Sequence, residues 1–521
     1  MSSVMQFLEQ KFTLFQPLSF SLLLFLSLPF LLKWLLSTTT TTTTKKNLPP
    51  SPPKLPIIGN LHQLGLYPHR SLLSLSKLHG PVMLLHLGSS PAVVVSSAAA
   101  AKEITKTHDL IFSNRPEFRI NRKLLYDLKD VSVAPYGEYW RQLKSIFVLQ
   151  LLSTKRVQSF RPAREAETTN MLNFIEKSCI SSPSSPPLNL SEMFSWLTSD
   201  VVCMAAFGKK YRVGERGEKF QKLLREFVGL VGGFDVGDFI PWLGWVSRLS
   251  GKDGEVDRVA KELDEFLDSV VQEHEDRMVE CGGESDESNE DFVDTMLKIQ
   301  RDNKSSVTID RDSIKALLLD VFAGGTDTTS TVLEWAMTQL LRHPKTMKKL
   351  QTEIRAIARG KPTVTEDDLD KMDYLKAVIK ETLRLHPPVP MPIPREASQE
   401  VDVMGYHIAA KTIVIINAWA IGRDPESWER PEEFWPERFF NSAVDFRGHD
   451  FELIPFGAGR RGCPGISFAM ATNEIVLANL MHKFDWEFPE GVKGEDLDMS
   501  ECTGLTIHRK VPLFAVATPC F

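Results

Sequence analysis

The stretch "PFGAGRRGCPG", residues 455–465, places four glycines, two prolines and two adjacent arginines around one cysteine, Cys463. A regular helix does not suit this composition, because each interior glycine costs about 1 kcal/mol relative to alanine. A single cysteine is more often an inert buried residue. Here, however, a glycine-rich turn can offer backbone N–H donors to a thiolate, and Arg461 can neutralise an anion beside it. The stretch therefore predicts a loop that presents a thiolate rather than an inert buried cysteine.

The N-terminal region is unusually apolar. Residues 18–36 read "LSFSLLLFLSLPFLLKWLL", with Lys33 and Trp34 near the end. As a helix these residues span about 28 Å, one hydrocarbon thickness. A cleaved signal peptide is the alternative, but seven threonines, 38–44, stand where a small-residue cleavage site is expected. We expect an uncleaved, single-pass membrane anchor within residues 1–36.

Charges around this segment predict its orientation. Lys45, Lys46 and Lys54 follow the apolar run, whereas only Lys11 precedes it. Cytoplasmic flanks of membrane helices carry the excess of lysine and arginine. The remainder of the chain is therefore expected on the cytoplasmic side.

A linker separates the anchor from the body. Residues 37–56 are rich in threonine and proline, with five prolines between 49 and 56. Prolines at this density hold an extended backbone, which predicts a semi-rigid hinge. No second boundary of this kind follows, so residues 57–521 are expected to form one domain.

Overall composition excludes several classes of protein. The formal net charge of −6 is small and spread along the sequence, so a nucleic-acid partner is not expected. The six cysteines show no Cys-x-x-Cys spacing, which argues against a zinc knuckle and a disulfide framework. Reduced thiols in a cytosolic environment fit best.

Helical periodicity dominates the body. Apolar residues recur at three and four positions from 309 to 344, where Asp310 or Asp312 can cap the start and Pro344 ends the run. Such a helix is nearly 50 Å long and crosses a whole domain. Short alternating runs that predict strands lie at 82–88, 92–97 and 412–420. The fold class is therefore mainly α with a small β subdomain.

The long predicted helix is interrupted by "AGGTDTTS", residues 323–330. Gly324 and Gly325 weaken a helix but let a flat group approach the backbone. Asp327 and Thr328 place a carboxyl and a hydroxyl beside that approach. The alternative is a packing kink whose polar groups are satisfied locally. We interpret the interruption as a functional site.

A charged network is predicted near the "KETLRLHPPVPMPIPR" segment, residues 380–395. Glu381 and Arg384 are three residues apart and therefore lie on one helical face. Exposed pairs of this kind are common and weak, but flanking leucines favour burial, which requires further partners. Arg438 in "FWPERF", 434–439, is the expected third member.

These motifs together resemble the cytochrome P-450 monooxygenases. "FGAGRRGCPG" matches the haem-binding signature of that family at every fixed position, and "GGTDTT", "ETLR" and "PERF" are similar to three further motifs in the same order. The sequences of the hinge and of the cysteine loop look most like those of plant microsomal A-type enzymes of the family 71 clan. The resemblance implies a cytochrome P-450 fold preceded by a single transmembrane helix in the endoplasmic reticulum membrane.

The resemblance implies a haem b site. Cys463 is then the axial ligand of the haem iron. Lys144 stands where the family usually has arginine, which keeps the charge but loses the bidentate geometry. The other expected haem contacts are Phe456 on the sulfur side, Gly459 and Gly465 in the loop, Gly324 and Gly325 on the opposite side, and Arg461, Trp140 and Arg395 at the propionates.

The resemblance also implies a reaction. O2 is the co-substrate, and Asp327 and Thr328 relay protons to it. The chain carries no flavin or nicotinamide fingerprint of its own, so NADPH acts through a separate cytochrome P-450 reductase. Arg460 and Lys144 are the residues that we expect to contact this reductase.

The expected substrate is a small hydrophobic plant metabolite such as a terpenoid, coumarin or alkaloid. Pocket residues expected by resemblance are Phe322, Val389, Met391, Thr503 and Leu505. They do not distinguish hydroxylation from epoxidation, demethylation or ring closure. Two alternatives remain: a haem-thiolate isomerase or dehydratase that needs no reductase, and a non-enzymatic membrane haem protein.

Overall fold

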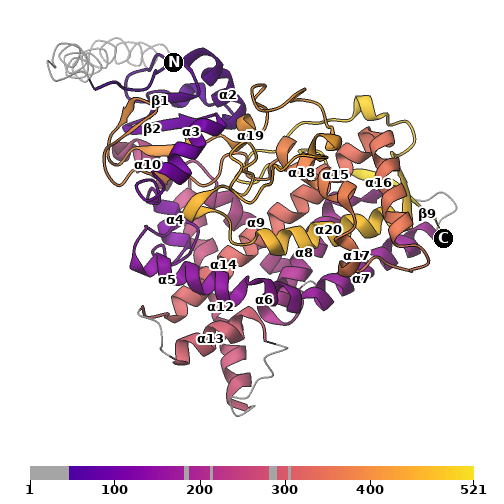
Figure 1. Ribbon diagram of the computed structural model, residues 1–521. Helices are drawn as coiled ribbons and strands as arrows, with labels where there is room; N and C mark the ends of the chain where they lie inside the picture. The colour runs from indigo at the N-terminus through magenta and orange to yellow at the C-terminus, as the bar shows by residue number, and fades with distance from the viewer. Residues whose placement is uncertain (1–45, 181–186, 212–214, 281–289, 303–306, 521) are drawn as a thin grey trace, which may run out of the picture.

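The computed structural model describes residues 46–180, 187–211, 215–280, 290–302 and 307–520. Helices fill most of the molecule, and a small sheet lies at the end formed by the first part of the chain (Figure 1). This arrangement confirms the expected class, mainly α with a small β part. The predicted anchor, 18–36, and the linker up to residue 45 lie outside the described residues.

The larger sheet has the strand order β1–β2–β7–β4. β1 (Val82–Leu87) pairs antiparallel with β2 (Ser90–Val95), β2 pairs parallel with β7 (Ile413–Ile416), and β4 (Arg395–Glu396) closes the sheet. The strand predicted over 412–420 is shorter than expected. The Asn417 side chain accepts a hydrogen bond from the Ala420 N–H and starts a short helix, α19 (Ala418–Ile421).

Two smaller sheets lie elsewhere. One joins β3 (Leu188–Asn189), β9 (Phe514–Pro519) and β8 (Phe484–Glu487), and the other joins β5 (Val401–Val403) to β6 (Tyr406–Ile408).

The long predicted helix is present, with a change of geometry inside it. α14 (Arg311–Phe322) passes into a π-helical turn, η5 (Ala323–Asp327), and continues as α15 (Thr328–Arg342). Asp310 caps the start through a 2.8 Å hydrogen bond from the Ser313 N–H. The π turn coincides with the glycine-containing interruption, where such turns often mark functional sites.

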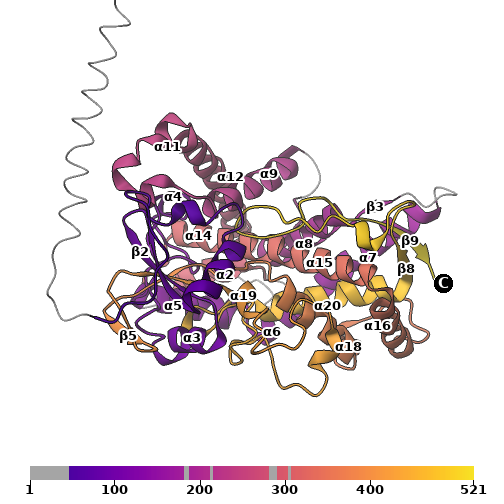
Figure 2. The same cartoon turned by 90° about the horizontal axis from the view of Figure 1, so that it is seen from above.

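Other helices surround this one. α8 (Leu190–Phe207) and α20 (Ile466–Lys483) pack beside α15, as Figure 2 shows. The remaining α-helices are α2 (Pro68–His79), α3 (Ala98–Lys102), α4 (Arg119–Leu124), α5 (Glu138–Ile146), α6 (Thr154–Ser159), α7 (Arg161–Ile180), α9 (Glu215–Val231), α10 (Val236–Phe239), α11 (Val246–Leu249), α12 (Lys252–Glu280), α13 (Phe292–Asp302), α16 (Pro344–Ile357), α17 (Glu366–Leu369) and α18 (Asp373–Leu385). The short η segments are η1 (Leu61–Gln63), η2 (Glu103–Thr107), η3 (Phe147–Leu151), η4 (Pro241–Leu243), η6 (Pro436–Phe439), η7 (Gly459–Arg461) and η8 (Gly494–Asp496).

The predicted charged network connects α18 to η6. Glu381, fully buried, accepts hydrogen bonds from Arg384 at 2.7 and 2.8 Å and from Arg438 Nε at 3.0 Å. The Trp435 N–H donates to the same carboxylate at 2.8 Å. The other N–H groups of Arg384 and Arg438 donate to backbone carbonyl oxygens. Hydrogen bonds therefore replace the water that both buried guanidinium groups have lost.

The described end of the proline-rich linker lies on the body. Pro50 accepts a hydrogen bond from the Leu84 N–H of β1 at 2.8 Å, and Asn47 donates to the Gly405 carbonyl oxygen at 2.7 Å. Lys46 pairs with Glu400 at 2.7 Å. Residues 46–56 are therefore attached to the sheet end of the domain.

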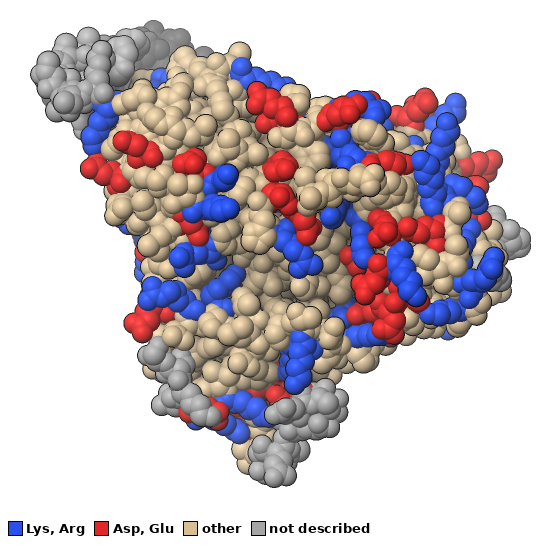
Figure 3. Space-filling model, in the orientation of Figure 1, with Lys and Arg blue, Asp and Glu red and all other residues tan. Residues whose placement is uncertain are grey.

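Charge is mixed on the surface. On the face drawn in Figure 3, basic and acidic side chains alternate around a hollowed central area. Within the described ranges, no single helix combines the length and apolar composition needed to cross a bilayer; the segments Lys219–Phe239 and Pro241–Leu249 satisfy these criteria only as a pair bent by 112°.

Candidate functional site

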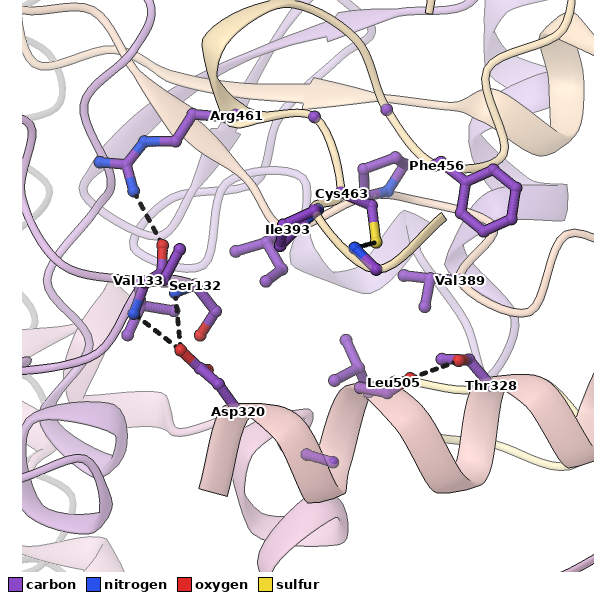
Figure 4. A pocket seen from close by; sticks show the side chains of 18 of the residues that line it. Ser132, Val133, Asp320, Thr328, Val389, Ile393, Phe456, Arg461, Cys463 and Leu505 are labelled. Atoms are coloured by element: carbon purple, nitrogen blue, oxygen red, sulfur yellow. Dashed lines mark hydrogen bonds between the residues drawn. The ribbon is translucent and has the colours of Figure 1, made fainter. Parts of the chain in front are cut away.

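A cavity of about 380 Å³ separates the cysteine loop from the π-helical turn. Figure 4 shows Cys463 and Phe456 on one side and the helix that carries Asp320 and Thr328 on the other. Residues from distant parts of the sequence close its ends, among them Trp140 and Leu505. The cavity is therefore the place where the two sequence motifs face each other.

The cysteine loop points its sulfur into this cavity. The Cys463 N–H donates to the Phe456 carbonyl oxygen at 2.9 Å, and the Gly465 N–H donates to the sulfur at 3.3 Å. Burial raises the pKa of the thiol, while the Gly465 hydrogen bond and the Lys144 charge act in the opposite direction. α20 begins directly after Gly465, so its positive N-terminal end also favours a thiolate.

Gly459 supports the loop from outside the cavity lining. Its φ of +67° lies in the left-handed region, and a Cβ there would overlap the Thr105 carbonyl oxygen. The position therefore requires glycine for the close approach of the loop to η2.

Two predicted cations lie side by side at one end of the cavity. Arg461 donates to the carbonyl oxygens of Ser113 and Ala134 at 2.7 and 2.6 Å and stacks 4.1 Å from the Trp140 ring centroid. Arg395 donates to the Ala458 carbonyl oxygen at 2.5 Å and pairs with Asp109 at 3.0 Å. Burial and the neighbouring Arg395 lower the pKa of Arg461 to about 9.

Lys144 lies at the same end. Its ammonium donates to the Gly462 carbonyl oxygen at 2.8 Å. Burial lowers the pKa of Lys144 to about 8, against the effect of the Cys463 charge. Lysine thus reaches the cysteine loop through one hydrogen bond.

Arg115 is a fourth cation that the sequence reasoning missed. It is 5% exposed and lines the cavity, donating to Ser132 and Pro394 carbonyl oxygens at 3.0 and 2.9 Å. Burial, followed by the charges of Arg461 and Arg395, holds its pKa far below the ordinary value. Neither spacing nor periodicity marks this arginine in the loop sequence "SNRPEF", 113–118.

The π-helical turn forms the opposite wall. Gly324, Gly325 and Thr328 line the cavity, and the Thr328 hydroxyl donates to the Gly324 carbonyl oxygen at 2.5 Å. Asp327 does not line it. The Asp327 backbone oxygen accepts from the Ser330 and Thr331 hydroxyls at 3.0 and 2.8 Å.

Three of the five predicted pocket residues do not line the cavity, whereas Val389 and Leu505 do. The prediction for Phe322 is wrong because its ring points into the core, where its centroid lies 4.7 Å from that of Phe207 and 5.1 Å from that of Phe220. Its neighbours on the helix, Val321 and Ala323, line the cavity instead.

The other two corrections have similar causes. Met391 packs against the core around β1 and β2, and Pro392 and Ile393 take its expected place. Thr503 is exposed at the tip of a C-terminal loop, whose next residues, Leu505 and Thr506, reach the cavity. In both segments the sequence predicts the right loop but not the side chain that faces inward.

The Cytochrome P450 family model matches residues 49–514. The chain belongs to the cytochrome P450 family. It is 57% identical to "Cytochrome P450 736A117" of Prunus mume over 99% of both chains. It is 54% identical to "Cytochrome P450 71A4" of Solanum melongena, covering 91% of this chain and 92% of that one. These relatives confirm the expected plant family 71 clan.

Two further comparisons agree with this assignment. "Norfluorocurarine oxidase" of Strychnos sp is 50% identical over 96% of this chain and 98% of its own length. A zebra fish cytochrome P450 structure with abiraterone superposes with a TM-score of 0.72 at 22% identity, covering 87% of this chain and 99% of that one. The structural match confirms the cytochrome P450 fold.

Cytochromes P450 use haem b and O2, and the residues of the cavity fit such a group. A sulfur supported by an N–H donor faces an apolar space, and four buried or half-buried cations gather at one end. Their lowered pKa values indicate mutual repulsion and burial that an anionic ligand relieves. The donors therefore suit an iron porphyrin with two carboxylates.

Proposed function

We propose that this cytochrome P450 is an NADPH-dependent haem-thiolate monooxygenase that oxidises a hydrophobic plant specialised metabolite. The observation that carries the proposal is the placement of Cys463 and Thr328 on opposite walls of one apolar cavity. A sulfur ligand on one face and a hydroxyl on the other leave a space in which oxygen and substrate meet.

In this proposal the Cys463 sulfur would hold the haem iron, and the Gly465 N–H and the N-terminus of α20 would stabilise its thiolate. Bound haem supplies an iron centre that activates O2 and delivers one of its oxygen atoms. Phe456 packs on the sulfur side. The residues assigned to the propionates are Trp140, Lys144, Arg395, Arg461 and, from the structure, Arg115.

Thr328 and Asp327 handle protons in this proposal. The Thr328 hydroxyl lines the cavity and donates to the Gly324 carbonyl oxygen, so it would be able to exchange that bond for one directed into the cavity and move a proton there. Asp327 precedes Thr328 in the chain and does not line the cavity, so it would pass a proton into the cavity only through Thr328. The π turn keeps both groups at the break in the helix.

The substrate is proposed to be a terpenoid, coumarin or alkaloid. Val389, Ile393 and Leu505 present aliphatic surface, and the cavity volume suits a small molecule. The relative named norfluorocurarine oxidase supports oxidation of a plant metabolite. These relatives do not favour the alternative function of a haem-thiolate isomerase or dehydratase.

We place the enzyme in the endoplasmic reticulum membrane with residues 18–36 as anchor and the domain in the cytoplasm. Electrons come from a separate reductase. Of the two proposed reductase contacts, Arg460 is exposed at 53%, whereas the Lys144 ammonium faces Gly462 and lines the cavity. Arg460 alone fits a surface contact.

The test uses membranes that contain the full-length protein and a panel of terpenoids, coumarins and alkaloids. Products are read by mass spectrometry with and without reductase and NADPH. A reductase-dependent gain of oxygen or loss of two hydrogens supports the proposal. Conversion without reductase indicates an isomerase or dehydratase, and absence of NADPH-dependent oxygen consumption with every compound indicates a non-enzymatic haem protein.

A further inference from the structure

A short hairpin near the end of the chain places a cysteine opposite a histidine. Glu501 and Arg509 form an antiparallel bridge, and the next N–H along, that of Cys502, donates to the His508 carbonyl oxygen at 2.9 Å. In this register Cys502 and His508 are directly opposite each other. Their side chains therefore leave the same face of the hairpin, with Cβ atoms about 5 Å apart.

The two faces of the hairpin differ in exposure. Glu501 and Arg509, on one face, are 5% and 2% exposed. On the other face Cys502 is half-buried and His508 is exposed. The thiol and the imidazole therefore lie side by side where small polar molecules from the solvent can reach them.

The same hairpin carries part of the cavity wall. Thr503 and Gly504 are exposed at its tip, and the next two residues, Leu505 and Thr506, line the cavity. Figure 4 includes Leu505 among the side chains around the open space. A chemical change at Cys502 therefore falls three residues before the wall of the cavity.

A hydrogen bond determines the tautomer of His508. Its Nδ1 lies 2.8 Å from the Arg509 carbonyl oxygen, which can only accept, so Nδ1 carries a hydrogen. Nε2 is then the ring nitrogen that can take a proton from the opposite thiol. A histidine that accepts this proton activates a cysteine as a nucleophile.

The groups that face His508 favour its protonated form. The hydrogen bond with the Cys502 side chain raises the pKa of His508 to about 9, and the Cys502 charge adds to this against the effect of burial. The Arg509 carbonyl oxygen and the charge of Asp327 in η5 act in the same direction. The proton shared by the pair can therefore rest on nitrogen, which leaves a thiolate.

The sulfur has two hydrogen-bonded arrangements. As a thiol, its S–H donates to the Thr506 carbonyl oxygen at 3.4 Å. As a thiolate, it accepts from the imidazolium of His508. Both arrangements hold the same number of protons, so their ratio does not change with pH as long as the pair keeps its proton. The thiolate is the nucleophilic form.

We propose that Cys502 is a redox-modification site, at which hydrogen peroxide oxidises the thiolate paired with His508 to a sulfenic acid. The sulfur attacks one oxygen of the peroxide and the O–O bond breaks. His508 gives its proton to the departing hydroxide, which leaves as water. The sulfur thus loses the two electrons that the peroxide gains.

The oxidation is reversible by small thiols. One thiol forms a mixed disulfide with the Cys502 sulfur and releases water, and a second thiol displaces Cys502 from this disulfide. Neither substrate nor reductase takes part, so the site is independent of the proposed monooxygenase function.

The experiment follows individual cysteines of the full-length holoenzyme by mass spectrometry of peptides. Iodoacetamide measures the rate of alkylation, and hydrogen peroxide with dimedone measures the rate of sulfenic acid formation. Cys179 is the internal control. It is also half-buried, its S–H donates to the Ala517 carbonyl oxygen at 3.2 Å, and burial and then the Glu176 charge raise the pKa of its thiol.

At pH 7 Cys502 should react with both reagents about tenfold faster than Cys179 or more, because an ordinary cysteine is only a few per cent thiolate there. Its alkylation rate should change less than about threefold between about pH 6 and 8, whereas that of Cys179 should rise roughly tenfold per pH unit. Equal rates for the two cysteines overturn the proposal, and this comparison needs no variant.

His508→Gln removes the proton acceptor. The rates at Cys502 should then fall about tenfold and take on the pH dependence of an ordinary thiol. Lys510→Gln is the matched control, since it removes a cation from the same strand, where the Lys510 N–H donates to Ser500, and it should leave both rates within about twofold. The reduced-CO spectrum verifies that each variant has folded.

Two outcomes overturn parts of the assignment. A loss of rate in Lys510→Gln as large as in His508→Gln would attribute the reactivity to positive charge in general and remove the role of His508. Rapid alkylation of Cys502 without a dimedone adduct after peroxide treatment would exclude hydrogen peroxide as the oxidant.

Discussion

The backbone N–H of Gly465 lies 3.3 Å from the Cys463 sulfur and donates to it, one residue before α20 begins. The hydrogen bond and the helix end both stabilise negative charge on sulfur, which burial alone would disfavour. The backbone around the cysteine thus opposes the effect of burial on the sulfur.

Replacing Cys463 by alanine should abolish the thiolate-ligated reduced-CO spectrum completely, because no other sulfur of the described residues lines the cavity. Absorbance spectroscopy of the purified protein checks this. Cys179→Ala, at a half-buried cysteine outside the cavity, should retain the spectrum. A normal spectrum from Cys463→Ala would refute the ligand assignment.

Replacing Thr328 by alanine should leave haem content unchanged and lower product per NADPH about tenfold, with the difference appearing as peroxide. The reason is that the hydroxyl at the π turn supplies protons to oxygen. The control is Thr352→Ala on α16, where the hydroxyl makes the same kind of bond to a carbonyl oxygen four residues earlier but is exposed. An unchanged yield of product per NADPH in Thr328→Ala would contradict the proton-supplying role of this hydroxyl.

Replacing Arg115 by methionine should speed haem loss about tenfold or more, because it removes one of the cations assigned to the propionates. Transfer of haem to an apo-globin acceptor measures the rate. Arg141→Met, on α5 over the Tyr136 ring, serves as control because Arg141 does not line the cavity. Equal rates for both variants would exclude Arg115 from the haem contacts.

Replacing Arg384 by alanine should destabilise the fold by about 3–5 kcal/mol, because it leaves the buried Glu381 carboxylate without its closest cation. Thermal unfolding with haem retained, together with haem content, measures the loss. Arg430→Ala removes an exposed pair with Glu433 and should cost less than about 1 kcal/mol. Similar losses for the two variants would contradict the buried-network interpretation.

Glu501 predicts a stability change at acid pH. Its carboxylate accepts from His69 at 3.0 Å and from Arg70 at 2.8 and 2.9 Å, which attaches the C-terminal loop to α2. Burial alone would raise its pKa, but these hydrogen bonds lower it to about 2. The folded pKa lies below the unfolded value, so the stabilisation is complete above about pH 4.5 and is lost as pH falls toward 2.

Glu501→Gln should therefore lower the free energy of unfolding by roughly 2–3 kcal/mol at neutral pH. Its difference from the parent should shrink between pH 4.5 and 2. Thermal unfolding across this range checks both points. A difference that is constant with pH would mean that the carboxylate charge is not the source of the stabilisation.

Much of the molecule follows from local sequence. The apolar periodicity of 309–344, its cap at Asp310 and its interruption at "AGGTD" predict a long helix with a break, and the structure contains both. The strands at 82–88 and 92–97 follow from alternation, and the order of four motifs identifies the family. The helix, its break and the strands depend on residues within a few turns of one another, so backbone propensity and hydrogen bonding determine them.

The details of the pocket depend on packing between distant segments. Phe322 and Met391 belong to the predicted segments but turn into the core, because Phe207, Phe220 and the larger sheet offer them apolar partners. A helix or loop pattern predicts that a segment borders a cavity. It does not specify which side chain of the segment points into the cavity, because that depends on where the neighbouring elements leave room.

The sequence by itself determined the family, the thiolate loop, the broken helix and the Glu381 network, since each is a short motif with its own chemistry. Only the tertiary structure placed Arg115 among the cations and joined Asp130 to Asp320, 190 positions apart, through one loop. The physical reason is that both arrangements arise from burial and from long-range hydrogen bonds. Neither exists until the chain has folded.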